Sequence, residues 1–151
     1  MLHTSSDMFS TPRVLVVEDD ESIRGMLLTT LRREPLYVDS AEDGEEALRL
    51  TAIHDYAVIL LDLMMPRVDG FAFLEQFHSD ARDRVPVIFV VTAFDDLVFE
   101  RIPAHHAHAI IRKPFDVLRL ATTIREVATA IHETRKVTRD VPLMAEERRA
   151  L

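Results

Sequence analysis

The sequence predicts a doubly wound α/β fold, in which helices cover both faces of a five-stranded parallel sheet. Three observations lead to this prediction. Short runs of consecutive apolar residues recur at 14–17, 57–62 and 86–92, as is typical of parallel strands buried on both faces. Segments with apolar residues at helical spacing separate these runs. Each strand runs into a polar turn, and such alternation favours right-handed crossovers between parallel strands.

The individual elements follow from the same patterns. The first helix has Ile23 and Leu27 on one face, and Asp20 and Glu21 are the acidic residues that favour a helix start. The last helix carries an apolar stripe over about four turns. We expect strands at 14–17, 36–40, 57–62, 86–92 and 109–113. We expect helices at 20–33, 43–54, 71–79, 94–102 and 116–136.

The domain organisation is simple. A chain of 151 residues is long enough for one hydrophobic core and too short for a second full domain. We expect a disordered lead-in over 1–12, one folded domain over 13–136 and a short tail over 137–151. The tail is too short for a DNA-binding output domain, and whether the domain stands alone or is excised from a longer protein stays open.

Composition excludes several classes of function. The net charge of -8 opposes binding to a phosphate backbone, so nucleic acid is not the expected direct ligand. The absence of cysteine excludes disulfides, thiolate catalysis and cysteine-based zinc sites, and it fits a reducing compartment. No apolar run has the length of a signal peptide or a membrane span, so we expect a cytoplasmic protein without membrane insertion.

Five chemically active side chains stand at the ends of the predicted strands. Because parallel strands end along one rim of the sheet, these side chains should gather there, where ligands of doubly wound folds bind. Carboxylates that converge repel one another unless a cation intervenes, and oxygen ligands without nearby sulfur or imidazole favour Mg²⁺ or Mn²⁺. A lysine and a hydroxyl at the same rim suit a phosphoryl group. The five residues are Glu18, Asp19, Asp62, Thr92 and Lys113.

The chain resembles the receiver domain of two-component response regulators. The segments VVEDDESIR (16–24), LLDLMMPRVDG (60–70), VVTA (90–93) and RKPF (112–115) look like that family's acidic-pair, phosphoacceptor, hydroxyl and lysine segments, in family order. The resemblance covers about residues 13 to 134. It implies a flavodoxin-like (βα)5 receiver fold with strand order 2-1-3-4-5.

The resemblance also implies a role for each site residue. Asp62 would be the phosphoacceptor, and Glu18 and Asp19 would form the acidic pair. Asp19, Asp62 and the backbone carbonyl of Met64 would bind Mg²⁺, with Glu18 beside them. Thr92 would contact the phosphoryl group and switch its loop inward, and Lys113 would pair with that group across a cis Lys113–Pro114 bond.

The implied activity is transfer of a phosphoryl group to aspartate. A histidine kinase or a histidine phosphotransfer protein would be the donor, and autodephosphorylation would be the only other reaction. The output target would bind the face formed by the 94–102 helix, the 109–113 strand and the 116–136 helix. A homodimer formed along the last helix is an alternative use of that helix.

Two other functions remain open at this point. Phosphohydrolases of the haloacid-dehalogenase type also use a strand-end aspartate with Mg²⁺, but they have a second aspartate where this chain has Met64. A receiver-like module that binds its partner without phosphorylation is the other alternative. It is suggested by two departures from the family pattern.

The first departure is Ile110, which stands at a switch position where the family commonly has tyrosine or phenylalanine. In the family this aromatic ring moves inward when the threonine or serine moves, and an aliphatic side chain offers no ring that could be buried or exposed in this way. The second departure is the loop with His105, His106 and His108. We interpret it as a polar connection, with zinc binding as the alternative.

Overall fold

The computed structural model describes residues 11–65, 69–79, 85–93, 102 and 107–140. Its five strands form one parallel sheet in the order β2-β1-β3-β4-β5, which confirms the predicted fold and strand order. The strands are β1 (Arg13–Val17), β2 (Tyr37–Ala41), β3 (Val58–Asp62), β4 (Val87–Thr92) and β5 (Ala109–Arg112). The helices are α2 (Glu21–Leu31), α3 (Gly44–Ile53), α4 (Gly70–Ser79) and α6 (Val117–Asp140).

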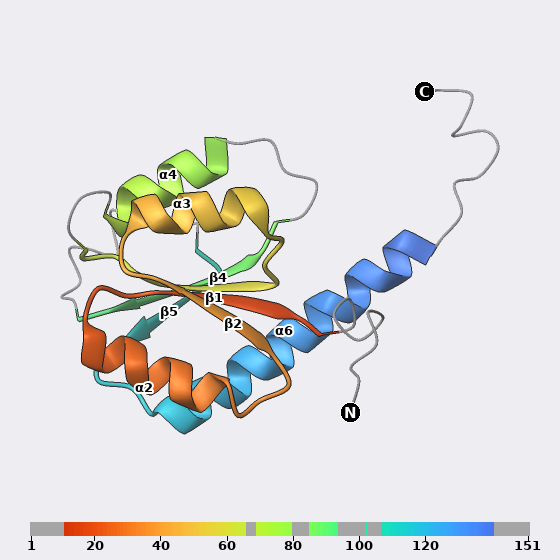
Figure 1. Ribbon diagram of the computed structural model, residues 1–151, viewed down its shortest axis with the longest axis horizontal. Coiled ribbons are helices and arrows are strands. Elements are labelled where there is room, and N and C mark those ends of the chain that lie inside the picture. The colour runs from red at the N-terminus through yellow and green to blue at the C-terminus, as the bar shows by residue number, and fades with distance from the viewer. Residues whose placement is uncertain (1–10, 66–68, 80–84, 94–101, 103–106, 141–151) are drawn as a thin grey trace.

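The helices cover the two faces of the sheet in pairs. Figure 1 shows α3 and α4 on one face and α2 and α6 on the other. The central strand β3 is buried at all five of its residues, because it has a neighbouring strand on each side and a helical layer on each face. The apolar runs in the sequence therefore mark the strands with the deepest burial.

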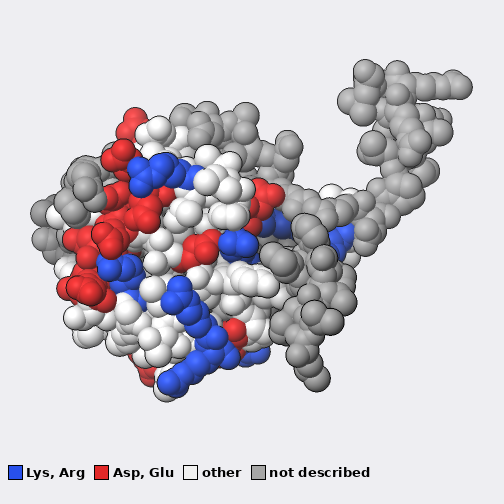
Figure 2. Space-filling model, in the orientation of Figure 1, with Lys and Arg blue, Asp and Glu red and all other residues white. Residues whose placement is uncertain are grey.

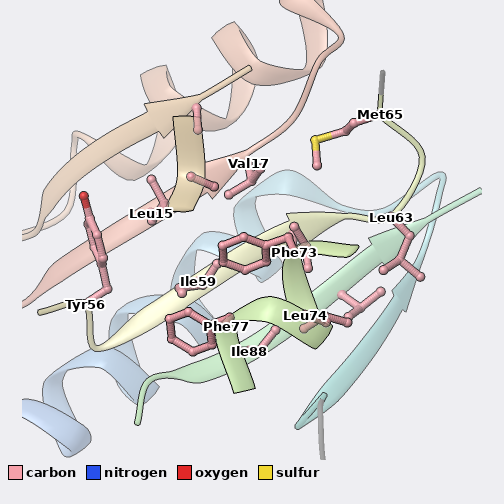
Figure 3. Packing of buried hydrophobic residues seen from close by; sticks show 14 of the residues in the cluster. Leu15, Val17, Tyr56, Ile59, Leu63, Met65, Phe73, Leu74, Phe77 and Ile88 are labelled. Atoms are coloured by element: carbon pink, nitrogen blue, oxygen red, sulfur yellow. The ribbon is translucent and has the colours of Figure 1, made fainter. Parts of the chain in front are cut away.

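Two hydrophobic clusters separate along the alternation of the strands. Leu15, Ile59 and Ile88 point toward α3 and α4, where Phe73 and Phe77 stack with ring centroids 5.4 Å apart (Figure 3). Their chain neighbours point toward α2 and α6. Because successive side chains of a strand point to opposite faces, each apolar strand supplies both cores.

The first two helices begin at capping residues. Asp20 and Asp43 accept hydrogen bonds from the backbone N–H groups of Ile23 and Glu46, at 2.9 and 2.8 Å. The prediction that Asp20 starts the first helix is confirmed. A side-chain cap of this kind contributes about 1 kcal/mol and fixes where the chain leaves each strand-to-helix loop.

The last helix is longer than its apolar pattern predicts. The apolar stripe ends at Ile131, but α6 continues to Asp140, beyond the predicted end at 136. Local contacts support the extension, including hydrogen bonds from the Thr134 and Thr138 hydroxyls to carbonyl oxygens one turn earlier, at 2.9 and 3.1 Å. The predicted helix at 94–102 and both chain ends lie almost wholly outside the described residues.

Candidate phosphoacceptor site

The first part of the site is the short connection between β1 and α2. Glu18 and Asp19 follow the last residue of β1 and precede the capping Asp20. The N–H of Glu18 donates to the carbonyl oxygen of Ala41 at 3.1 Å, which keeps the chain beside β2 for one more residue. The side chain of Glu18 is buried, with a relative exposure of 2%, whereas Asp19 is exposed. The connection thus places one carboxylate inside the rim and one at its surface.

The second part is the end of β3. Asp62 is the last residue of this strand and is only 5% exposed. Its Oδ1 accepts a hydrogen bond from the backbone N–H of Met64 at 3.1 Å. Because β3 lies between β1 and β4, its end is the centre of the rim.

Gly70 holds the chain close to Asp62. A Cβ at Gly70 would lie 2.5 Å from the carbonyl oxygen of Asp62 and 2.5 Å from the Cα of Leu63. The N–H of Gly70 also donates to the carbonyl oxygen of Leu63 at 3.0 Å. Only glycine permits this approach of two backbone segments. Gly70 therefore keeps the start of α4 in contact with the end of β3.

Lys113 reaches the carboxylates from the residue after β5. Its backbone N–H donates to the carbonyl oxygen of Thr92 at 2.9 Å, and the Lys113–Pro114 bond is cis, as the family resemblance implied. Its Nζ lies 3.1 Å from Oε2 of Glu18 and 3.5 Å from Oδ2 of Asp62. One ammonium group therefore faces two buried carboxylates.

The three carboxylates can hold a metal ion. One oxygen atom from each of Glu18, Asp19 and Asp62 lies within 4.8 Å of the others. A donor set made only of oxygen suits a hard cation such as Mg²⁺, which commonly keeps several water ligands. Figure 2 shows that acidic side chains gather on the side of the molecule where α2 begins. The residues present therefore fit the metal that the family resemblance implied.

Thr92 supplies a hydroxyl that the described part of the fold leaves unsatisfied. Its side chain is 0% exposed, and its Oγ1 has no hydrogen-bond partner among the residues the structure describes. A buried hydroxyl without a partner costs on the order of 1–3 kcal/mol. The register of the sheet puts Val91 opposite Asp62, so Thr92 lies one residue further along the rim than Asp62. A ligand oxygen at the rim would satisfy this group.

The ionisation of the carboxylates reflects their crowding. Burial, followed by the nearby charge of Asp62, raises the pKa of Glu18 to about 7, although Lys113 opposes the shift. Burial likewise raises the pKa of Asp62, against the Met64 N–H and the Lys113 ammonium. Burial alone would lower the pKa of Lys113, but the two carboxylates raise it. The single positive charge of Lys113 is thus too little to keep both buried carboxylates, Glu18 and Asp62, at their ordinary pKa values.

This imbalance predicts that the metal-free protein loses stability as the pH rises. The folded state holds a proton on Glu18 between its ordinary pKa of 4.5 and about 7, whereas the unfolded state releases it in that window. The free energy of unfolding should therefore fall by up to about 3 kcal/mol from pH 4.5 to pH 7. Urea unfolding without Mg²⁺ would measure this slope. Glu18→Gln should flatten it, and an equally steep slope in that variant would contradict the assignment.

The structure brings the predicted residues together with one exception. Glu18, Asp19, Asp62 and Lys113 converge, and Thr92 lies beside them. Ile110 lies on the edge strand β5, away from them, with 42% of its side chain exposed. The sequence pattern did not predict the roles of the Met64 N–H or of the Arg24 guanidinium, which donates to the carbonyl oxygens of Glu18 and Asp19.

The histidine-rich loop is described only at His108. The Nδ1 atom of His108 accepts a hydrogen bond from the backbone N–H of Ile88 at 2.9 Å. The backbone N–H of His108 donates to the carbonyl oxygen of Ile88, also at 2.9 Å. These two bonds lengthen the contact between β4 and β5. His105 and His106 lie outside the described residues, so the zinc alternative stays a prediction.

The structure combines a doubly wound parallel sheet with an acidic site and a lysine at the carboxyl ends of its strands. Comparison with known protein families identifies the family that has this combination. The family model for the response regulator receiver domain matches residues 14–125. The chain therefore belongs to the receiver domain family of two-component response regulators. Receiver domains of this family are signalling modules that interact with histidine kinases and output targets.

Curated relatives agree with this assignment. The transcriptional regulatory protein PdtaR of Mycobacterium tuberculosis is 34% identical over 146 residues, which cover 95% of this chain and 69% of that protein. The response regulator MprA of Mycolicibacterium vanbaalenii is 38% identical over 115 residues, which cover 75% of this chain and 48% of that protein. The chain spans about half the length of several such relatives.

Solved structures share the fold. The chemotaxis response regulator CheY4 of Vibrio cholerae has a TM-score of 0.69 and 29% identity, covering 78% of this chain and 98% of that one. The response regulator TrrA of Thermotoga maritima, solved in complex with Mg²⁺ and BeF, has a TM-score of 0.67 and 27% identity over 78% and 99%. Among the described helices, none is long and apolar enough to cross a membrane.

Proposed function

We propose that Asp62 accepts a phosphoryl group from a histidine kinase or a histidine phosphotransfer protein in the cytosol. The observation that carries this proposal is the convergence at the end of β3. There, the Asp62 carboxylate lies within 4.8 Å of the other two carboxylates and 3.5 Å from the Lys113 ammonium. Such a site can hold a cation and a phosphoryl group at the same strand end.

The chemistry is a displacement at phosphorus. One carboxylate oxygen of Asp62 forms a bond to phosphorus while the bond from phosphorus to the donor nitrogen breaks, and the nitrogen keeps the electron pair. The Met64 N–H, which donates to Oδ1, orients the Asp62 carboxylate. Glu18, Asp19, Asp62 and the Met64 carbonyl would hold Mg²⁺, which when bound neutralises charge on the phosphoryl oxygens.

The remaining residues respond to the new group. Lys113 would leave its present contact with Asp62 Oδ2 to pair with a phosphoryl oxygen, because the product adds about 1.5 to 2 negative charges at that position. The unpartnered Thr92 hydroxyl would donate to another oxygen. Movement of Thr92 would shift the end of β4 and change the surface beside β5, where Ile110 is exposed. We propose that an output protein reads this surface.

Phosphorylation by acetyl phosphate with Mg²⁺ tests the proposal. Intact-mass measurement should show the gain of one phosphoryl group in the wild-type protein and none in Asp62→Asn. Asp20→Asn is the matched control, because Asp20 is a neighbouring exposed carboxylate and asparagine caps a helix equally well. Labelling of Asp62→Asn at the wild-type level would refute the assignment of Asp62.

A further inference from the structure

Arg24 connects the first helix to the acidic connection that carries Glu18 and Asp19. It lies in the first turns of α2, and its side chain turns back along the chain. Its Nη1 donates to the carbonyl oxygens of Glu18 at 3.0 Å and of Asp19 at 3.3 Å. Its backbone N–H donates to the carbonyl oxygen of Asp20 at 2.8 Å. The carbonyl groups of three successive residues, Glu18, Asp19 and Asp20, therefore all accept hydrogen bonds from Arg24.

These carbonyl groups belong to the peptide units that carry the acidic pair. Glu18 and Asp19 lie between β1 and α2, so their carbonyl groups belong to the connection between the two elements. The side chain of Arg24 is 14% exposed, so most of it is packed against the molecule. A backbone segment held by a buried guanidinium keeps the Cα–Cβ bonds of its residues in fixed directions, which limits where their carboxylates can lie.

Arg24 also joins two loops of the rim. Its Nη2 lies 3.4 Å from Oε1 of Glu42, the residue that follows β2. The N–H of Glu42 donates to Oε2 of Glu46 in α3 at 3.0 Å, so this second loop is itself fixed at the start of a helix. The connection that carries the acidic pair is thereby braced against its neighbour in the sheet.

The positive charge of Arg24 is unfavourable at the start of a helix and also next to a cation site. A positive side chain near the start of a helix is disfavoured by the helix dipole. A positive charge beside the three carboxylates would also repel a bound cation. Electrostatics alone therefore predicts that removal of Arg24 strengthens Mg²⁺ binding, whereas its hydrogen bonds to the Glu18 and Asp19 carbonyls predict the opposite.

We propose that Arg24 is a positioning residue for the metal site, which fixes the direction of the Asp19 and Glu18 carboxylates through their carbonyl groups. This inference rests on the proposed function in one respect, since it takes these carboxylates as the Mg²⁺ ligands. Residues that orient metal ligands in this way typically change metal affinity by ten- to a hundredfold when they are removed.

Calorimetric titration with Mg²⁺ alone, without a phosphodonor, tests the proposal. Arg24→Met should raise the dissociation constant for Mg²⁺ about tenfold. Arg24→Lys keeps a donor and the charge, and should lie within about threefold of wild type, because its ammonium can still meet a carbonyl group. If Arg24→Met does not fold, Arg24→Gln takes its place with the same expected weakening.

Two control variants separate positioning from general effects. Arg13→Met removes the same charge at the other end of β1, where Arg13 pairs with Asp39 at 2.8 Å, and should leave Mg²⁺ affinity within about twofold of wild type. Glu42→Gln removes the ion pair and leaves the carbonyl contacts of Arg24, and it should also stay within about twofold. In labelling with acetyl phosphate, Arg24→Met should raise the Mg²⁺ concentration for half-maximal rate and leave the rate at saturating Mg²⁺ unchanged.

The possible failures are distinguishable. Unchanged or tighter Mg²⁺ binding in Arg24→Met would overturn the positioning role and leave the assignment of Asp62 untouched. Absence of Mg²⁺ binding in the wild-type protein would instead overturn the proposed metal site and, with it, this inference. An equal weakening in Arg13→Met would also overturn the inference, because it would trace the effect to a general disturbance of the fold and not to the contacts that Arg24 makes.

Discussion

Replacement of Lys113 with methionine is expected to lower the rate of phosphorylation by acetyl phosphate at least a hundredfold at saturating Mg²⁺. Among the described residues, Lys113 is the only cation in contact with Asp62, at 3.5 Å. Loss of one such donor at a reacting oxygen typically lowers the rate by about 10²- to 10³-fold, which corresponds to about 3–4 kcal/mol. The initial rate of phosphoryl incorporation, followed by intact mass, measures the effect.

Lys136→Met is the matched control for that experiment. Lys136 is the only other lysine in the sequence, and it forms an ion pair with Glu133 at 3.6 Å on the exposed face of α6. Its removal should change the rate by less than about twofold. A wild-type rate in Lys113→Met would show that the ammonium balances Glu18 and Asp62 without serving the phosphoryl group.

Replacement of Gly70 with alanine should damage the site through the backbone. The added Cβ meets the Asp62 carbonyl oxygen and the Leu63 Cα, both at 2.5 Å, and neither is a flexible side chain that can turn away. We expect a loss of about 3 kcal/mol in the free energy of unfolding, at the upper end of the range for overpacking. Because the end of β3 must shift, Mg²⁺ affinity should fall as well. Urea unfolding and Mg²⁺ titration measure the two effects.

Gly25→Ala is the matched control, and it should raise the free energy of unfolding, whereas Gly70→Ala should lower it. Gly25 lies in the interior of α2, and apart from its own helix backbone a Cβ there would meet no atom of the described residues within 4 Å. Alanine is favoured over glycine inside a helix by about 1 kcal/mol, so this variant should be more stable than wild type. Equal effects of the two substitutions would contradict the close backbone approach at Gly70.

The sequence predicted the parts of the site that depend on strand position. Asp62, Thr92 and Lys113 could be placed at one rim because each follows a run that only a parallel strand explains, and β3, β4 and β5 are neighbours in the sheet. The motif segments of the receiver family then assigned a role to each residue. Both steps use regularities of the backbone that a linear sequence displays.

Contacts that depend on side-chain direction could not be predicted in this way. Arg24 lies one turn into a helix, and nothing in its spacing shows that it turns back toward the Glu18 and Asp19 carbonyl groups. The end of α6 was missed for a different reason. Its last residues lack an apolar stripe, and local bonds such as Thr138 to Thr134 carry the helix onward.

The Asp39 carboxylate shows what the phosphoacceptor rim lacks. Burial alone would raise the pKa of Asp39, but hydrogen bonds from the Tyr56 hydroxyl at 2.7 Å and from Arg13 at 2.8 Å bring it below its ordinary value. At Asp62 burial outweighs the opposing Met64 N–H and Lys113 ammonium, and the pKa stays raised. Both carboxylates belong to the same sheet.

Unresolved electrostatic conflict is therefore concentrated at one end of an otherwise consistent fold. In the metal-free protein, local opening should begin at Glu18 and Asp19 after β1 and at Leu63 and Met64 after β3, and leave the strands closed, so that amide protons at these residues exchange with solvent first. A cation that relieves the conflict would slow this opening. Cation binding at Glu18, Asp19 and Asp62 should therefore make the adjoining loops more rigid even without a phosphoryl group.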